Sequence, residues 1–130
     1  MDILKRMNAA IAYIEAHLLD GFDPDELARI TLYTSDGFNR FFSYAAGMTL
    51  KEYIRRRRLT LAAYDLRASA EKVIDVALKY GYESADSFAR AFFRQHRISP
   101  SAARRPCALL RVYPPVSFHI LIKGAKEMNL

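Results

Sequence analysis

One short apolar pattern occurs twice in this 130-residue chain, and it limits the folds available. Residues 38–42 (FNRFF) reappear as residues 88–92 (FARAF). Before each copy comes a short turn, and before that turn an apolar residue followed by alanine, at residues 27–28 and 76–77. Because each copy has its phenylalanines at helical spacing, the repeat predicts two helix-turn-helix units in succession.

Helix-start and helix-stop signals delimit the first unit. Apolar residues three or four apart predict a helix over residues 2–18. Asp23 is a typical N-cap, with proline at the first helical position and Glu26 placed to reach back as in a capping box. After a turn at residues 32–33, Thr34 or Ser35 is expected to cap a helix that runs to about residue 46.

A long helix is expected to connect the two units. Thr49 and Glu52 have the spacing of a capping box, and the helix they open extends to about residue 66. Four consecutive arginines, residues 55–58, interrupt its apolar side, and we expect Arg57 to extend past that side to solvent.

The second unit repeats the plan of the first. A helix over residues 73–80 ends at Gly81, and Ser84 is placed to cap the next helix, with Phe88, Phe92 and Phe93 along it. A short helix follows from residues 99–100. The expected fold is all-α, with about seven helices in two helix-turn-helix subdomains on either side of the connector.

The segment after Pro106 has a different composition. Residues 109–115 contain two prolines and read as a linker, and residues 116–124 are rich in β-forming side chains. We expect a C-terminal β-prone tail in which residues 112–123 stand apart from the helical core, either disordered or paired with a second chain. The predicted division is therefore 1–108 for the helical domain and 109–130 for a linker and the incomplete start of another domain.

The charge balance narrows the range of partners. Lys and Arg number 20 against 14 Asp and Glu, which gives a net charge of +6 and favours a polyanionic partner, although a solvated basic surface is the plain alternative. The single cysteine, Cys107, excludes an internal disulfide and a multi-cysteine metal site. No phosphate-binding glycine loop or catalytic signature is present, so we expect no cofactor, no metal and no enzymatic activity. With no signal peptide and no membrane-spanning apolar run, a cytoplasmic location is expected.

The second unit resembles a known family. Residues 74–77 (IDVA), 80–84 (YGYES), 87–92 (SFARAF) and 98–100 (ISP) resemble the DNA-binding domain of AraC/XylS-type transcription regulators, and the resemblance covers about residues 5–105. It implies a bacterial regulator of the activator type that binds double-stranded DNA and contacts RNA polymerase. Residues 113–129 resemble the opening of a GyrI-like effector-binding domain, which implies a small-molecule effector for the full-length protein.

The sequence departs from the family pattern at the ends of two helices and in the last helix. Leu32 lies where the first turn usually has glycine, and Arg97 replaces the usual helix-ending glycine of the second unit. Residues 102–103 are both alanine where an acidic-aromatic pair is common. Arg97 leaves the end of its helix open to question.

The resemblance also implies which side chains meet DNA. The N-terminal half of a recognition helix contacts base edges, and arginine and asparagine match guanine and adenine. The base-contact candidates are Asp36, Asn39, Arg40, Ala85, Asp86, Ala89 and Arg90. The phosphate-contact candidates are Thr34, Arg56, Ser84, Arg94, Gln95 and Ser99.

Alternatives remain for the residues and for the chain. A surface salt bridge or a phosphate contact competes with base contact at Arg40 and Arg90, and helix-dipole stabilisation competes at Asp36 and Asp86. A basic helical protein-interaction module and a DNA-associated alkyl-acceptor enzyme that uses Cys107 are the rival functions. A chain with two readers can act as a monomer or weak dimer on contacts roughly 34 Å apart.

Overall fold

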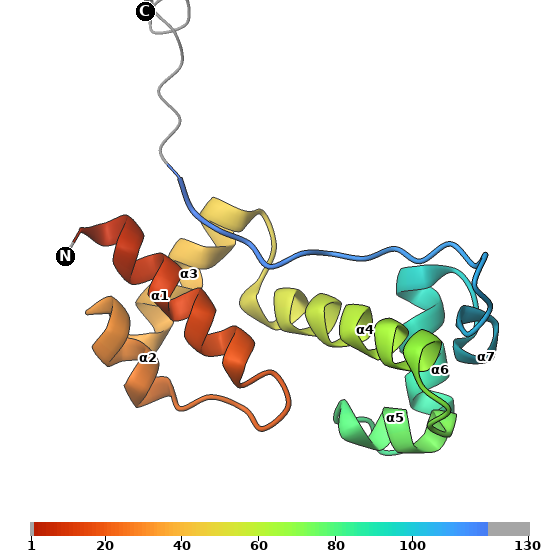
Figure 1. Ribbon diagram of the computed structural model, residues 1–130. Helices are drawn as coiled ribbons and strands as arrows, with labels where there is room; N and C mark the ends of the chain where they lie inside the picture. The colour runs from red at the N-terminus through yellow and green to blue at the C-terminus, as the bar shows by residue number, and fades with distance from the viewer. Residues whose placement is uncertain (1, 120–130) are drawn as a thin grey trace, which may run out of the picture.

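The computed structural model describes residues 2–119, and all regular structure within that range is helical (Figure 1). The helices in residues 2–119 are α1 (Ile3–Ala16), α2 (Pro24–Thr31), α3 (Ser35–Ala46), α4 (Leu50–Ala68), α5 (Val73–Lys79), α6 (Ala85–His96) and α7 (Pro100–Ala103). The expected all-α fold with about seven helices is confirmed for these residues.

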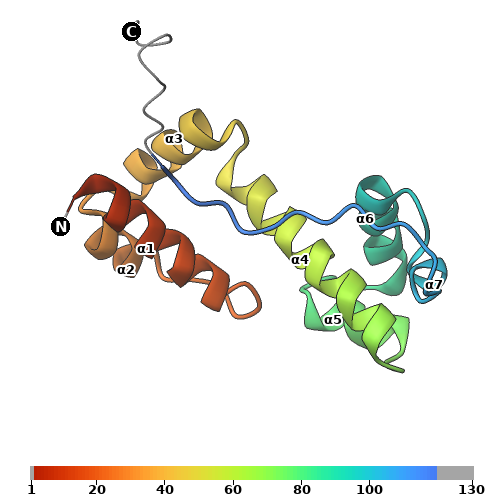
Figure 2. The ribbon, with the colours of Figure 1, turned by 45° about the horizontal axis from the view of Figure 1, so that its top comes forward.

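Two lobes lie at opposite ends of α4 (Figures 1 and 2). The first lobe packs α1–α3 around the start of α4, and its core includes Met7, Ile14, Phe38, Phe42 and Tyr53. The second packs α5–α7 around the end of α4, with a separate core that includes Leu59, Leu66, Val76, Phe88 and Phe92. Each copy of the repeated phenylalanine pattern therefore fills the core of its own lobe.

The N-caps predicted from the sequence are in place. Asp23, Thr34, Thr49, Ser84 and Ser99 each accept a hydrogen bond from a backbone N–H of the first turn of their helices, at 2.9–3.1 Å. These bonds satisfy donors that an α-helix leaves without an internal partner, which is why the helices begin at these residues.

The return half of each predicted capping box is replaced by an ion pair. Glu26 pairs with Arg29, and the Glu52 carboxylate lies 2.9 Å from the Arg56 guanidinium. The backbone N–H of Asp23 donates instead to the Tyr13 hydroxyl, at 2.9 Å. A cationic side chain one turn ahead competes successfully for each glutamate.

Both departures at helix ends keep a left-handed backbone. Leu32 has φ 64° and Arg97 has φ 63°, the region that favours glycine. The backbone N–H of Arg97 still donates to the Phe93 carbonyl at 2.8 Å, so α6 ends where a glycine would end it. The substitutions leave the helix ends unchanged.

The prediction that Arg57 extends to solvent was wrong. Arg57 is 8% exposed, and its Nε and Nη2 atoms both donate to the Glu15 carboxylate at 2.9 Å. The Tyr53 hydroxyl donates to the same carboxylate at 2.6 Å. The guanidinium stays inside because Glu15 of α1 supplies a paired charge there.

Of the three phenylalanines expected along α6, Phe93 lies outside the core. The buried side of α6 carries Phe88, Phe92 and His96, each one turn from the next. Phe93 lies one residue round the helix from that side and is 49% exposed.

The segment after Leu109 crosses the molecule as an extended strap (Figures 1 and 2). We call residues 109–119 the C-terminal strap. Its backbone bonds to side chains of both lobes: the Tyr113 N–H donates to Thr60 Oγ1 at 3.0 Å, and the Val116 N–H donates to the Tyr53 hydroxyl at 3.3 Å. The strap thus joins the second lobe to the first.

The far end of the strap is seated in the core of the first lobe. The amide of Asn8 forms two hydrogen bonds with the backbone of Phe118, at 2.8 and 3.0 Å. The Phe118 ring packs edge-on against Phe41 and Phe42. The expectation that residues 112–123 stand apart from the helical core was therefore wrong for 112–119, and 120–123 lie outside the described residues.

Candidate nucleic-acid interface

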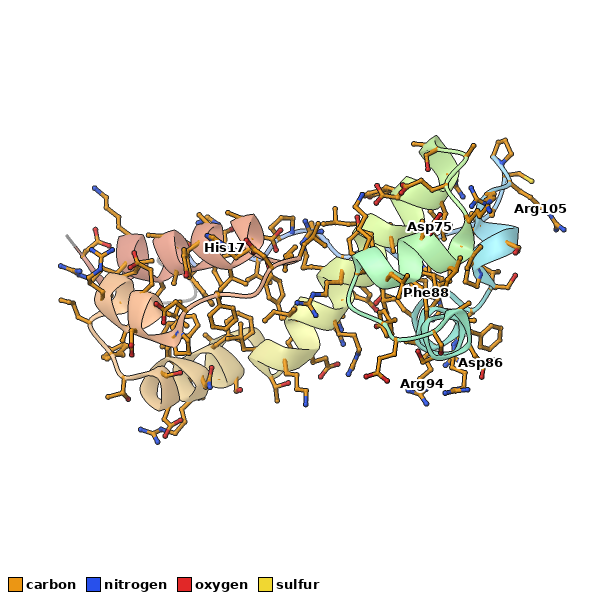
Figure 3. The ribbon with its side chains drawn as sticks, turned by 90° about the horizontal axis from the view of Figure 1, so that it is seen from below. His17, Asp75, Asp86, Phe88, Arg94 and Arg105 are labelled. Atoms are coloured by element: carbon orange, nitrogen blue, oxygen red, sulfur yellow. The ribbon has the colours of Figure 1, made fainter. Side chains whose placement is uncertain are left out.

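The two predicted recognition helices lie on the same side of the molecule. In Figure 3, α3 and α6 both lie along the lower edge, while α1 lies above α3. The labelled Asp86 and Arg94 side chains project from α6 at that edge, and Phe88 lies inside the lobe. One face of the protein therefore presents both helices.

The predicted base-contact residues all lie on the outer sides of these helices. Asp36, Asn39 and Arg40 of α3 are exposed, as are Asp86 and Arg90 of α6. The remaining two, Ala85 and Ala89, are partly buried.

Arg40 and Arg90 correspond in the two helices but have different neighbours. Arg90 Nη1 lies 2.6 Å from the Asp86 carboxylate, one turn earlier, and both side chains are largely exposed. Within residues 2–119 no hydrogen bond or ion pair engages the Arg40 side chain. An exposed pair of this kind contributes less than about 1 kcal/mol, so Arg90 can exchange its partner at little cost.

Of the six predicted phosphate-contact residues, Arg56 is partly buried and paired with Glu52. Thr34, Ser84 and Ser99 cap their helices, so their hydroxyls lie beside free N–H groups at three helix starts. Arg94 is exposed on α6, near the outer face. These four residues lie where an anion can approach.

Gln95 is partly buried, and its amide nitrogen is already bonded within the molecule. Its Nε2 atom lies 3.0 Å from the Arg111 carbonyl, 3.2 Å from Thr60 Oγ1 and 3.3 Å from the Arg56 carbonyl. An amide nitrogen has two hydrogens, so these acceptors already occupy both. Gln95 thus ties α6 to α4 and to the strap.

A run of hollows leads from α3 to α6 along α4. The first, beside Ser35 and Asn39 of α3, shares Lys51 and Ile54 with the second. The second shares Arg55 with a third hollow between α4, α6 and the strap. The third shares Arg94 with a fourth on the outer face of α6. We call these four neighbouring hollows together the interlobe groove.

The interlobe groove is basic. Lys51, Arg55 and Arg58 follow one another at helical spacing along α4, so they share a side of that helix. Burial raises the pKa of the Tyr82 hydroxyl, and the nearby positive charges of Arg55, Arg58 and Arg94 act against that rise. Side chains of α4 and α6 therefore direct positive charge into one path, which attracts a polyanion.

Sequence reasoning missed Lys51, Arg111 and Tyr113 among the groove residues. The helical spacing of Lys51, Arg55 and Arg58 was available as a signal, because the three residues lie on a predicted helix. Nothing in the sequence placed Arg111 or Tyr113 beside α4, since that contact depends on the path of the strap.

The described residues contain no metal cluster and no membrane span. No group of three or more His, Cys, Asp or Glu side chains converges to hold a metal ion in residues 2–119. No helix in that range is long and apolar enough to cross a membrane. Cys107 is an exposed free thiol.

Comparison with known proteins gives consistent matches. A family model described as a helix-turn-helix domain matches residues 27–106. The HTH-type transcriptional activator AarP of Providencia stuartii is 42% identical over 94 residues, covering 72% of this chain and 70% of AarP. The regulatory protein SoxS of Escherichia coli K12 is 37% identical over 94 residues, covering 72% of this chain and 88% of SoxS.

Solved structures share the fold. The DNA-binding domain of AdpA, a global transcriptional factor solved in complex with a target DNA, matches with a TM-score of 0.64 and 27% identity, covering 76% of this chain and 89% of that one. An AraC-type regulator from Chromobacterium violaceum matches with a TM-score of 0.69 and 20% identity, covering 77% and 89%.

Proposed function

This chain belongs to the AraC-type helix-turn-helix family, and from that premise we propose that it regulates transcription by sequence-specific binding to double-stranded DNA. The observation that carries the proposal is the interlobe groove, which links two exposed recognition helices on one face. Each helix enters one segment of the major groove, and the basic path between them follows the phosphate backbone.

The base contacts are assigned by chemistry. Arg40 and Arg90 present planar donor pairs that match the O6 and N7 acceptors of guanine, and Asn39 matches N6 and N7 of adenine. Asp36 and Asp86 can accept from cytosine N4, while Ala85 and Ala89 allow apolar contact with a thymine methyl group. Asp86 also holds Arg90 while no DNA is bound.

The phosphate contacts come from helix starts and from arginines. Thr34, Ser84 and Ser99 mark N-termini whose free N–H groups favour an anion. Arg94 and Arg56 add charge from α6 and α4. Gln95 supports this surface through its bonds to α4 and the strap, rather than by a contact of its own.

We also propose that the protein contacts RNA polymerase and is located in the cytoplasm. AarP is named as a transcriptional activator, and this relationship supports activation. An effector-binding domain beginning within residues 109–130 stays a prediction, as does the monomer or weak dimer.

Equilibrium binding to a fluorescent duplex tests the proposal. Each phosphate neutralised contributes about −0.9 to the slope of log K against log salt, so several contacts give a steep slope. Binding to a selected site that survives excess non-cognate competitor would exclude a protein-interaction module. A slope near zero would contradict DNA binding altogether.

The alkyl-acceptor alternative has a separate test. An enzyme of that kind would transfer an alkyl group to the Cys107 sulfur, and the intact mass would rise after incubation with alkylated DNA. We expect no change in mass.

A further inference from the structure

A cluster of arginines surrounds the middle of the interlobe groove. The hollow has a volume of about 260 Å³ and lies between α4, α6 and the C-terminal strap. Arg55 and Arg56 come from α4, Arg94 from α6 and Arg111 from the strap, whereas Glu52 is the one carboxylate in its lining. Four arginines and one glutamate line the hollow, so its surroundings carry an excess of positive charge.

The strap fixes two of these arginines. The Arg56 guanidinium lies 4.6 Å from the centre of the Tyr113 ring and is paired with Glu52. The backbone of Arg111 is tied on both sides: its N–H donates to His96 Nδ1 at 3.0 Å, and its carbonyl accepts from Gln95 Nε2 at 3.0 Å. These contacts hold the Arg56 guanidinium and the Arg111 backbone in position before any ligand binds.

The chemistry of the hollow suits a phosphate group. Like charges on the residues that line one hollow repel each other, and a bound anion relieves that repulsion. The guanidinium fork matches two phosphate oxygens at once, which a compact ammonium group cannot do.

The location identifies the source of the phosphate. Arg94 also lines the hollow on the outer face of α6 beside Arg90, and Arg55 continues the basic side of α4 toward Lys51. The cluster therefore lies on the path between the two recognition helices. We infer that this hollow binds a backbone phosphate of the DNA segment between the two major-groove contacts, and that the C-terminal strap completes the site through Arg111 and Tyr113. The inference rests on the proposed function.

Substitution Arg111→Gln tests the role of the strap. It removes the charge but keeps the backbone bonds to His96 and Gln95. Loss of one phosphate contact reduces the magnitude of the salt slope by about 0.9, so the advantage of the wild type shrinks about threefold between 50 and 200 mM salt. The weakening is equal on specific and non-specific duplexes, because a phosphate carries no sequence information.

Two further variants complete the design. Arg105→Gln is the matched control, because Arg105 is exposed and projects away from α6 at the end of the second lobe (Figure 3). The salt slope of this variant stays at the wild-type value. Arg55→Gln changes an exposed residue of α4 and gives the same loss of slope as Arg111→Gln. Thermal unfolding by circular dichroism verifies that each variant is folded.

The outcomes separate this inference from the proposed function. A wild type with no salt slope overturns both. A normal wild-type slope that Arg111→Gln and Arg55→Gln leave unchanged overturns the phosphate site alone. Calorimetric titration with inorganic phosphate tests free phosphate as the other source. If Arg111→Gln abolished stoichiometric phosphate binding but left DNA binding unchanged, the hollow would be a site for free phosphate, and the inference would be overturned.

Discussion

Arg40 and Arg90 occupy equivalent places in α3 and α6, and each is expected to specify one half of the binding site. Replacing either with alanine removes a bidentate base contact, which costs about 1–3 kcal/mol on the matching site. The loss should appear only for base pairs in one half-site. Affinities for duplexes with single base-pair changes measure this. Uniform weakening on all sequences would mean that both residues contact phosphate instead.

Arg97 is predicted to lower stability through its left-handed backbone. An L-residue there costs about 1–2 kcal/mol, while glycine loses about 0.4–1 kcal/mol more chain entropy on folding. Arg97→Gly should therefore raise the free energy of unfolding by about 0.5 kcal/mol in urea denaturation.

Gly47 provides the matched comparison for Arg97. It has φ 74° with open space where a Cβ would lie, so only the backbone opposes a side chain there. Gly47→Ala should lower the free energy of unfolding by about 1 kcal/mol. Stabilisation by Gly47→Ala, or destabilisation by Arg97→Gly, would contradict the backbone argument.

Helix α4 depends on a buried ion pair with α1. The Arg57 and Glu15 side chains are 9% and 19% exposed. Glu15→Gln leaves the Arg57 charge inside without its partner, and the free energy of unfolding should fall by about 3 kcal/mol. Glu26→Gln, which breaks the more exposed pair with Arg29 in α2, should cost less than about 1 kcal/mol. Equal effects of the two changes in urea denaturation would refute the buried role.

Helix α6 and the strap meet at a neutral histidine. His96 Nε2 lies 2.9 Å from the Leu59 carbonyl, which only accepts, and Nδ1 accepts from the Arg111 N–H. Burial lowers the pKa of His96 from its ordinary value of 6.5, although the bond to Leu59 opposes that shift. Protonation would convert Nδ1 into a donor facing another donor.

Stability should therefore fall in mild acid. The unfolded chain takes up the His96 proton at about pH 6.5, before the folded protein does, so stability is lost as pH falls from there toward the folded pKa. Melting temperatures between pH 7.5 and 5.5 measure the slope. His96→Gln should flatten it, because it removes the group that takes up the proton. An unchanged slope in His96→Gln would contradict the account.

Helix boundaries were predictable because their causes are local. Thr34, Ser84 and the other caps lie within three residues of the N–H groups they satisfy, so the sequence alone indicates where the helices begin. The place of Arg57 was not predictable, since its partner Glu15 is 42 residues away. The exposed basic side of α4 was predictable in part. The spacing of its residues can be read from the sequence, but its position beside α6 depends on the fold.

At the scale of the whole molecule, the duplicated pattern correctly gave two lobes and a connector. The strap was misjudged because prolines and β-branched residues indicate extended backbone but not what that backbone contacts. In the structure Asn8, Tyr53 and Thr60 supply the hydrogen bonds that a neighbouring strand would supply in a sheet. Long-range side-chain partners of this kind leave no periodic signal in the sequence.

The central claim is that one chain reads two adjacent segments of the major groove. Selection of bound duplexes from a random pool, followed by sequencing, tests it most directly. The account predicts two conserved blocks whose centres lie about 10 base pairs apart, roughly one helical turn. Arg40→Ala should reduce sequence conservation in one block and Arg90→Ala in the other. A single conserved block that both variants affect alike, or no enrichment at all, would contradict it.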